Sequence, residues 1–297
     1  MAVCDVCFRK CDIPEGKRGW CRARGNEGGH IYPANYGVVT GLALDPIEKK
    51  PLSRFMPGSM ILSVGSFGCN LDCPFCQNFE IARAFEENAA SEDPDVLYSD
   101  EDGLHRINVR RMTPEELCAL AQETRSQGNA GVAFTYNEPL VGWEFVRDTA
   151  RLVRAAGMKN VLVSNGCVNA DVAEEIIPLM DAANIDLKCF SEDGYKGFLG
   201  GDLELTKGFI RRAAGRIQLE LTTLIIPGFN DTEEEMEREA EWIAGLDDGR
   251  GCEIPLHISR FFPRHRLTDR DATDVGLVYR LAEVARKYLK YVYTGNC

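Results

Sequence analysis

The sequence has few features of an exported or membrane-bound protein. Its 297 residues contain no apolar run of about 18 residues, the length that a membrane-spanning helix needs. The first residues, Met1-Ala2-Val3-Cys4-Asp5, lack the charged-then-apolar pattern of a secretory signal. We therefore expect no membrane association and a cytoplasmic location, where a reducing environment leaves the 12 cysteines available for metal rather than for disulfides.

Positive charge is also scarce. The chain has 34 Lys and Arg against 46 Asp and Glu, a net charge of −12. Affinity for nucleic acid comes mainly from neutralised phosphates, so this balance argues against a nucleic-acid substrate. The argument is weakened because much of the acidic excess lies within 86–102, while basic clusters such as Lys49-Lys50 lie elsewhere. We interpret 86–102 as a solvated segment: a lid, a docking site for an electron donor, or disordered chain.

Strand-like and helical segments alternate along most of the chain. The expected strands are 60–67, 131–136, 160–164, 183–188, 217–226, 254–261 and, with a weaker pattern, 291–294. The expected helices are 114–127, 141–156, 171–180, 206–214, 232–244 and 271–289. Two of them begin with capping-box pairs, Thr113 with Glu116 and Thr232 with Glu235. Such alternation favours a parallel α/β sheet, either a partial (β/α)6 TIM-like barrel or a flat doubly wound sheet.

The first 30 residues are dense in cysteine. Four thiols occur as Cys4-x2-Cys7-x3-Cys11-x9-Cys21, with glycines between and after them. A loop-rich segment this short cannot form a stable core without a cross-link such as a bound metal. We therefore expect a small metal-binding module over 1–30 and a main domain over 31–297. Four thiolates at this spacing suit a zinc ion or a second iron–sulfur cluster.

Another thiol array follows the strand expected at 60–67: Cys69-Asn-Leu-Asp-Cys73-Pro-Phe-Cys76. Three closely spaced thiolates on one loop suit a cubane [4Fe-4S] cluster. No further cysteine follows until Cys118, so three ligands serve four irons and one iron stays open. An open iron can hold the amino and carboxylate groups of S-adenosylmethionine (SAM) and pass an electron to its sulfonium. The alternatives are a zinc site or buried free thiols.

Polar residues follow the next three expected strands. Working residues of parallel α/β barrels lie just past the C-terminal ends of the strands. The pairs at these ends are Asn137 and Glu138, then Ser164 and Asn165, then Asp186 and Lys188. We expect the first pair to bind the ammonium group of SAM, the second its ribose hydroxyls, and the third its carboxylate and ribose. Ordinary turns and a buried ion pair are the alternative explanations.

The C-x3-C-x2-C loop resembles that of the radical SAM superfamily, and this resemblance favours the partial barrel over the flat sheet. Asp186-Leu187-Lys188 resembles the Asp-x-Lys motif of the pyruvate formate-lyase activating enzyme branch. Tyr136-Asn137-Glu138-Pro139 stands where that branch has its Gly-Gly-Glu motif. More closely, the segments 45–52, 68–70 and 136–139 resemble the AmmeMemoRadiSam-type radical SAM enzymes, and the resemblance runs over nearly the whole chain.

The resemblance implies a set of cofactors and partners. Cys69, Cys73 and Cys76 would hold one SAM-binding [4Fe-4S] cluster, and Phe75 of the same loop would belong to the SAM site. The electron donor would be a ferredoxin or a flavodoxin. The substrate and the fate of SAM, consumed or regenerated, are left open by the sequence.

Four further residues are candidates for contact with the substrate. Cys167 and Cys189 directly follow the ends of the third and fourth strands, where they could relay a hydrogen atom, ligate metal or touch substrate. Buried inert thiols are the alternative. On the strand expected at 254–261, we assign His257 and Arg260 to the substrate mouth, with a buried core histidine as the alternative.

These patterns predict a radical SAM enzyme that generates a 5′-deoxyadenosyl radical and abstracts a hydrogen atom from its substrate. By resemblance, the substrate is a backbone glycine of a partner protein, as for a glycyl-radical-enzyme activase. The alternative substrates are a small molecule or another protein residue. A function of another class is a non-catalytic iron–sulfur or zinc module that binds SAM or a partner.

Overall fold

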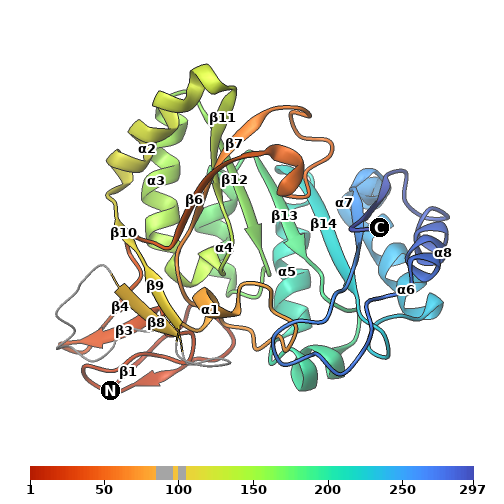
Figure 1. The fold of residues 1–297 in the computed structure, drawn as a ribbon, viewed down its shortest axis with the longest axis horizontal. Coiled ribbons are helices and arrows are strands. Elements are labelled where there is room, and N and C mark those ends of the chain that lie inside the picture. Colours follow the sequence, from red (N-terminus) through yellow and green to blue (C-terminus); the bar gives the residue numbers. More distant parts are fainter. Residues whose placement is uncertain (85–95, 100–104) are drawn as a thin grey trace.

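The computed structural model describes residues 1–84, 96–99 and 105–297 (Figure 1). Among these residues, no helix is both long and apolar enough to pass through a bilayer. Most of the acidic segment 86–102 lies outside the described residues, so our interpretation of it stays a prediction. Its described part is strand β8 (Val96–Ser99), which pairs antiparallel with β9 (His105–Asn108).

A sheet of eight strands forms the centre of the fold. In spatial order the strands are β16 (Val292–Gly295), β15 (Leu256–Arg260), β14 (Gln218–Ile225), β13 (Ala182–Asp186), β12 (Lys159–Ser164), β11 (Asn129–Phe134), β7 (Met60–Gly65) and β6 (Gly41–Pro46). All pairings are parallel except that of β6 with β7. Within the described chain β6 and β16 are edges that do not pair with each other, so the barrel is partial, as predicted.

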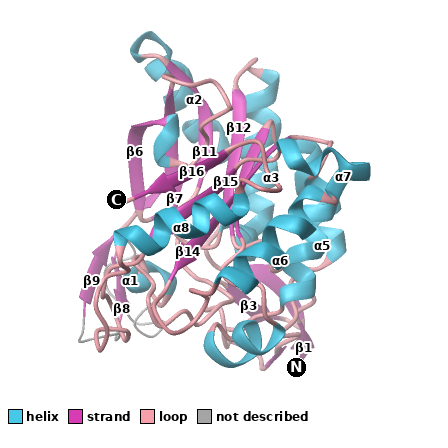
Figure 2. Cartoon of the chain, turned by 90° about the vertical axis from the view of Figure 1, so that its right-hand side faces the viewer, coloured by secondary structure: helices cyan, strands magenta, loops and turns pink. Residues whose placement is uncertain are grey.

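Helices connect the parallel strands, and α5, α6 and α8 lie outside the sheet in Figure 2. They are α2 (Pro114–Glu123), α3 (Trp143–Ala155), α4 (Ala170–Ile176), α5 (Leu203–Ala213), α6 (Glu233–Ala244), α7 (Leu246–Gly249) and α8 (Val275–Ala285). Thr113 and Glu116 form the predicted capping box. At α6 the box is incomplete, because Thr232 accepts from the Glu235 N–H while the Glu235 carboxylate accepts from the Phe190 N–H at 2.6 Å.

Alternate residues of each strand face the helices and the inside of the barrel. Leu62 and Val64 of β7 pack in the large core shared with the helices. Ile61, the residue before Leu62, packs inward with Ile47 and Leu52 of the connection between β6 and β7. This alternation follows from the pleat of a strand, which sends successive side chains to opposite faces.

The connection between β6 and β7 closes one end of the barrel interior. The backbone N–H groups of Ser53 and Arg54 donate to the Glu220 carboxylate at 2.9 and 2.8 Å. The Asn184 side chain donates to the Pro51 carbonyl at 2.8 Å. The other end, at the carboxyl ends of the parallel strands, is where the cysteine loop lies.

The cysteine-rich N-terminus packs against loops at this carboxyl end. It forms two small antiparallel pairs, β1 (Ala2–Val3) with β2 (Asp12–Ile13) and β3 (Arg24–Glu27) with β4 (His30–Pro33). Arg9 donates to the Asn70 carbonyl at 2.8 Å. A further pair joins β5 (Val38–Val39) to β10 (Arg110–Arg111), and the short helix α1 (Phe79–Ala82) follows the cysteine loop. The division at residue 30 remains a prediction.

Candidate active site

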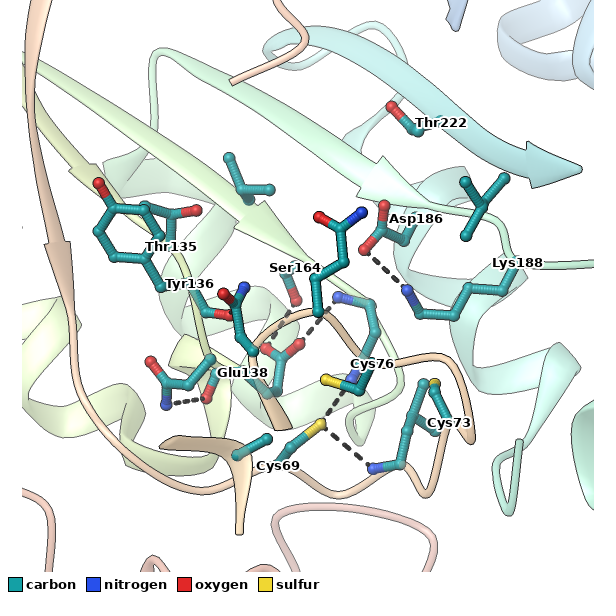
Figure 3. A pocket seen from close by; sticks show the side chains of 18 of the residues that line it. Cys69, Cys73, Cys76, Thr135, Tyr136, Glu138, Ser164, Asp186, Lys188 and Thr222 are labelled. Carbon is teal, nitrogen blue, oxygen red and sulfur yellow. Dashed lines mark hydrogen bonds and ion pairs between the residues drawn. The ribbon is translucent and has the colours of Figure 1, made fainter. Parts of the chain in front are cut away.

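A cavity of about 360 Å³ opens at the carboxyl ends of the strands (Figure 3). It is lined by the three thiols of the cysteine loop and by all the residues predicted to bind SAM. These residues are Cys69, Cys73, Cys76, Phe75, Asn137, Glu138, Ser164, Asn165, Asp186 and Lys188. The parallel sheet brings them together because it aligns the ends of β7, β11, β12 and β13 along one edge.

The Asn137 side chain holds the backbone that leads into the cysteine loop. The Asn137 side chain accepts from the Ser66 N–H at 2.9 Å and donates to the Phe67 carbonyl at 3.0 Å. Gly68 has φ +94°, and a Cβ there would lie 2.7 Å from the Cys21 carbonyl oxygen. A glycine is therefore required where the loop turns against the N-terminal segment.

The thiols lie where free thiolates would be unstable. Burial raises the pKa of Cys73 to about 12 and that of Cys69 well above its usual value. A bound cation reverses this effect, because the thiolate is the metal ligand. The Cys69 sulfur accepts from the Leu71 N–H at 3.4 Å and from the Asn165 side chain at 3.8 Å, contacts of the kind that surround cluster sulfurs.

The three thiols could ligate three irons of a cubane cluster. In the described part of the chain, no three His, Cys, Asp or Glu side chains are arranged to hold a single metal ion, either at this loop or among the N-terminal cysteines. No fourth cysteine is among the residues that line the described cavity. Three sulfur ligands for a four-iron cubane leave one iron open, in a cavity with room for a further ligand.

Glu138 connects the ends of β11 and β12. Its carboxylate accepts from the Leu140 N–H at 2.9 Å, the Ser164 hydroxyl at 2.7 Å and the Asn165 N–H at 2.8 Å. Burial raises the pKa of Glu138 to about 7, against the lowering effect of these donors. Glu138 and Ser164 therefore order the cavity wall as well as line it.

Asp186 and Lys188 form the charged pair predicted at the end of β13. The Lys188 Nζ lies 2.9 Å from an Asp186 oxygen, and both side chains are partly exposed to the cavity. Burial alone would lower the pKa of Lys188, but the Asp186 charge and the neighbouring Cys73 raise it overall. The ammonium group is therefore positive, and Figure 3 shows it directed at the Asp186 carboxylate.

Comparison with protein-family models shows to which family the chain belongs. Residues 63–243, which include the cysteine loop and strands β11 to β14, match the model of the radical SAM superfamily. This chain belongs to the radical SAM superfamily. Membership implies a [4Fe-4S] cluster and SAM, and the donor set on the loop fits both.

Two relatives and one solved structure resemble this radical SAM protein. It is 36% identical over 296 residues to the uncharacterized protein MJ0808 of Methanocaldococcus jannaschii, covering 99% of this chain and 80% of the relative. It is 24% identical over 178 residues to pyruvate formate-lyase 1-activating enzyme of Escherichia coli, covering 58% and 70%. The fold resembles Streptococcus suis SuiB with a TM-score of 0.54 at 11% identity, covering 79% of this chain and 48% of SuiB.

The four residues predicted to contact substrate do not line the described cavity. Cys167 is fully buried, with its sulfur 3.3 Å from the Asp202 carbonyl, and Cys189 is buried with its sulfur 3.6 Å from the Ser191 carbonyl. His257 lies 2.7 Å from Glu220, at the closed end of the barrel interior. Arg260 donates to the Thr273 carbonyl at 2.7 Å. These four residues therefore lie outside the lining of the described cavity, and their contact with substrate stays a prediction.

Some cavity residues were not assigned a role from the sequence. Lys49, Lys50, Tyr136, Thr222 and Ser259 all line the cavity. In the sequence, the two lysines were noted only as a cluster of positive charge. Tyr136 was noted only because segment 136–139 resembles a family motif. Strand alternation could have found Thr222, because it shares a β14 face with the inward-facing Glu220.

The four N-terminal cysteines line a separate small cavity beside the cysteine loop. Burial raises the pKa of Cys4, Cys7 and Cys21, that of Cys21 to about 12. Arg24 lines the same cavity, and its buried Nε has no hydrogen-bond partner among the described residues. An unpaired guanidinium nitrogen beside buried thiols suits an anionic centre such as a metal bound by thiolates.

Proposed function

We propose that this protein cleaves SAM reductively and abstracts a hydrogen atom from a substrate. The observation that carries the proposal is the placement of Cys69, Cys73 and Cys76 on the same cavity as the Asp186–Lys188 pair. When bound, the cluster supplies one electron that cleaves the S–C5′ bond of SAM, giving methionine and a 5′-deoxyadenosyl radical that takes hydrogen from the substrate.

The side chains of the cavity have distinct roles in this proposal. The three cysteines hold the cluster, and Lys188 attracts the carboxylate of SAM while Asp186 accepts from its hydroxyl or ammonium donors. Glu138 keeps the ends of β11 and β12 in register, so that Ser164 and Asn165 face the ligand. Phe75, which is 5% exposed, supplies apolar surface beside the cluster and helps exclude water.

One candidate substrate, taken from the resemblance to activating enzymes, is a backbone glycine of a partner protein. The similarity to pyruvate formate-lyase 1-activating enzyme supports this activase function. For an activase of this kind, the electron donor would be a ferredoxin or flavodoxin in the reducing cytoplasm. A small molecule or another protein residue is the second candidate, favoured by the lysine pair that lines the cavity.

The alternative to an enzyme is a non-catalytic module that binds SAM or a partner protein. Such a module would use the same cavity without cleaving SAM. The polar residues at successive strand ends, which line that cavity with the three thiols, support turnover instead. The 5′-deoxyadenosine experiment below separates the two functions.

We also propose that Cys4, Cys7, Cys11 and Cys21 hold zinc or a second iron–sulfur cluster. Their shared cavity and the unpaired Arg24 Nε support a bound anionic metal centre. Gly68 brings the cysteine loop against the Cys21 carbonyl, so metal at the N-terminal site would brace the loop that carries the catalytic cluster.

The first test is formation of 5′-deoxyadenosine by anaerobically reconstituted protein with SAM and dithionite. We expect product from the wild-type protein and none from the variant with Cys69, Cys73 and Cys76 replaced by alanine. Cys252→Ser is the matched control, since Cys252 lies outside the residues that line the two cysteine cavities. A wild-type protein that carries the cluster and forms no product would favour the binding module.

A further inference from the structure

The cavity extends beyond the thiols and the residues assigned to SAM. The further lining includes a wall formed by Lys49, Lys50 and Tyr136. Figure 3 shows Tyr136 at the left of the cavity, apart from the three labelled cysteines near the bottom. This wall has no role in the binding of the cluster or of SAM as proposed above.

The wall carries a net positive charge. The Nζ atoms of Lys50 and Lys49 lie 3.0 and 3.3 Å from the two oxygens of Asp45. Burial alone would raise the pKa of Asp45, but its contacts with Lys50, Tyr136 and Lys49 lower it to about 2, so this carboxylate is ionised at neutral pH. Among the described residues, Asp45 is the carboxylate that pairs with both lysines. Two positive ammonium groups therefore share one negative carboxylate.

The lysine pair differs from a flexible surface cluster because Lys50 is fixed in place. Its side chain is 4% exposed, and its Nζ lies 4.8 Å from the centre of the Tyr136 ring. The Tyr136 hydroxyl donates to Asp45 at 3.0 Å. An ammonium held between a carboxylate and an aromatic face loses little freedom when it binds an anion.

Tyr136 itself has a strained backbone. Its φ is +71°, in the left-handed region that an aromatic residue adopts at a cost of about 1–3 kcal/mol. Its ring lies on two glycines of neighbouring strands: a Cβ would come within 2.6 Å of the ring at Gly65 and 3.6 Å at Gly41. Such strain persists where the surrounding structure enforces it, and it is concentrated at functional sites.

We propose that this wall binds an oxyanion, the carboxylate or phosphoryl group of a small-molecule substrate. The inference rests on the radical SAM function proposed above and names the class of its substrate. Lys49 and Lys50 supply the positive charge that attracts the oxyanion. A substrate anchored there extends toward the cysteine end of the cavity, where its hydrogen atom is taken.

The carboxylate of SAM does not account for these lysines. Lys188 lines the cavity together with the three thiols and is the cation assigned to that carboxylate. A neutral glycine of a partner protein would not need a second cationic site. The lysine pair therefore favours an anionic small molecule over a backbone glycine.

The experiment measures binding of two probes, succinate and glycerol 3-phosphate, to anaerobic cluster-loaded protein with SAM present. Calorimetric titration at low ionic strength would compare wild type, Lys49→Met and Lys50→Met. Lys49→Met is the safer variant, because its side chain is 66% exposed and Asp45 keeps Lys50 as a partner. Lys159→Met removes an exposed lysine that pairs with Asp181 at 2.8 Å, and serves as the control.

We expect one probe to bind, with an affinity at least about tenfold lower in both cavity variants and unchanged in the control. Binding of succinate alone indicates a carboxylate substrate, and binding of glycerol 3-phosphate alone a phosphoryl one. No binding of either probe, or equal binding in all variants, would overturn the proposal. So would a tenfold loss of SAM affinity in Lys49→Met, which would assign the lysine to SAM. Failure of the proposed function itself shows separately, as absence of 5′-deoxyadenosine from wild-type protein.

Discussion

The Tyr136 hydroxyl donates a 3.0 Å hydrogen bond to the Asp45 carboxylate, across 91 residues of sequence. This bond joins the segment after β11 to the end of β6, the one antiparallel strand of the central sheet. It holds the tyrosine ring flat over β6 and β7, and so shapes the wall that the ring forms with Lys49 and Lys50. Gly65 lies beneath this ring and leaves no space for a larger residue.

Gly65→Ala should destabilise the protein and displace Tyr136. The added methyl group would lie 2.6 Å from the ring and 3.0 Å from the Tyr136 Cβ, so the strained tyrosine would have to move. Overpacking of this kind costs about 1–3 kcal/mol. Urea unfolding would measure the change. Gly197→Ala is the control, because a Cβ there meets nothing within 4 Å; equal stability of the two variants would contradict the packing argument.

Removal of either member of the Asp186–Lys188 pair should weaken SAM binding. Each single change, Asp186→Asn or Lys188→Met, leaves a charge without its partner in a cavity that SAM must enter. We expect the Kd of SAM to rise at least about tenfold in both variants, measured anaerobically on cluster-loaded protein. Lys159→Met, which breaks an ion pair of similar length at the surface, should leave the Kd unchanged. Wild-type affinity in both cavity variants would remove the pair from the SAM site.

Glu239 should make stability depend on pH. Burial raises the pKa of Glu239 to about 8, and the Thr223 hydroxyl, which donates to the Leu187 carbonyl at 2.9 Å, also contacts its carboxyl group. Because a hydroxyl carries one hydrogen, a protonated Glu239 satisfies both contacts. The folded pKa lies above the unfolded one, so this stabilising contribution is complete below about pH 4.3 and is lost as pH rises through about 8.

The Glu239→Gln variant should lose this part of the pH dependence, since an amide can donate to Thr223 at any pH. Unfolding free energies between pH 5 and pH 9 would compare it with wild type and with Glu237→Gln, an exposed change on the same helix whose amide oxygen can still accept from Tyr288. A wild-type profile in Glu239→Gln would show that Glu239 is ionised throughout.

The N-terminal cysteines should hold a metal that is separate from the SAM cluster. Purified protein should contain about four irons and one zinc, or about eight irons and no zinc, per chain. Cys7→Ser and Cys21→Ser should lose the N-terminal metal alone and unfold at a lower temperature. Cys118→Ser, at a buried thiol of α2, is the control for lost packing. Unchanged metal content in all three variants would exclude the site.

The sequence by itself determined the features that depend on neighbouring residues. The alternation of apolar and polar segments placed the strands and helices in the right order, because strand and helix periodicities are local. The C-x3-C-x2-C spacing identified the cluster loop, since three ligands on eight residues must lie close together in any fold. The residues after the strands could also be predicted to meet, because parallel strands share one carboxyl edge.

Only the tertiary structure decided which side chains enter the cavity. Lys50 reaches it from the connection after β6 because Asp45 and Tyr136 hold its ammonium group there, and these contacts join distant parts of the chain. The sequence pattern assigned His257 to the substrate mouth, yet its side chain pairs with Glu220 at the closed end of the barrel interior. How far along the barrel each inward residue lies depends on the register between strands and on the loop that fills the interior. Neither is encoded in the pattern of a single segment.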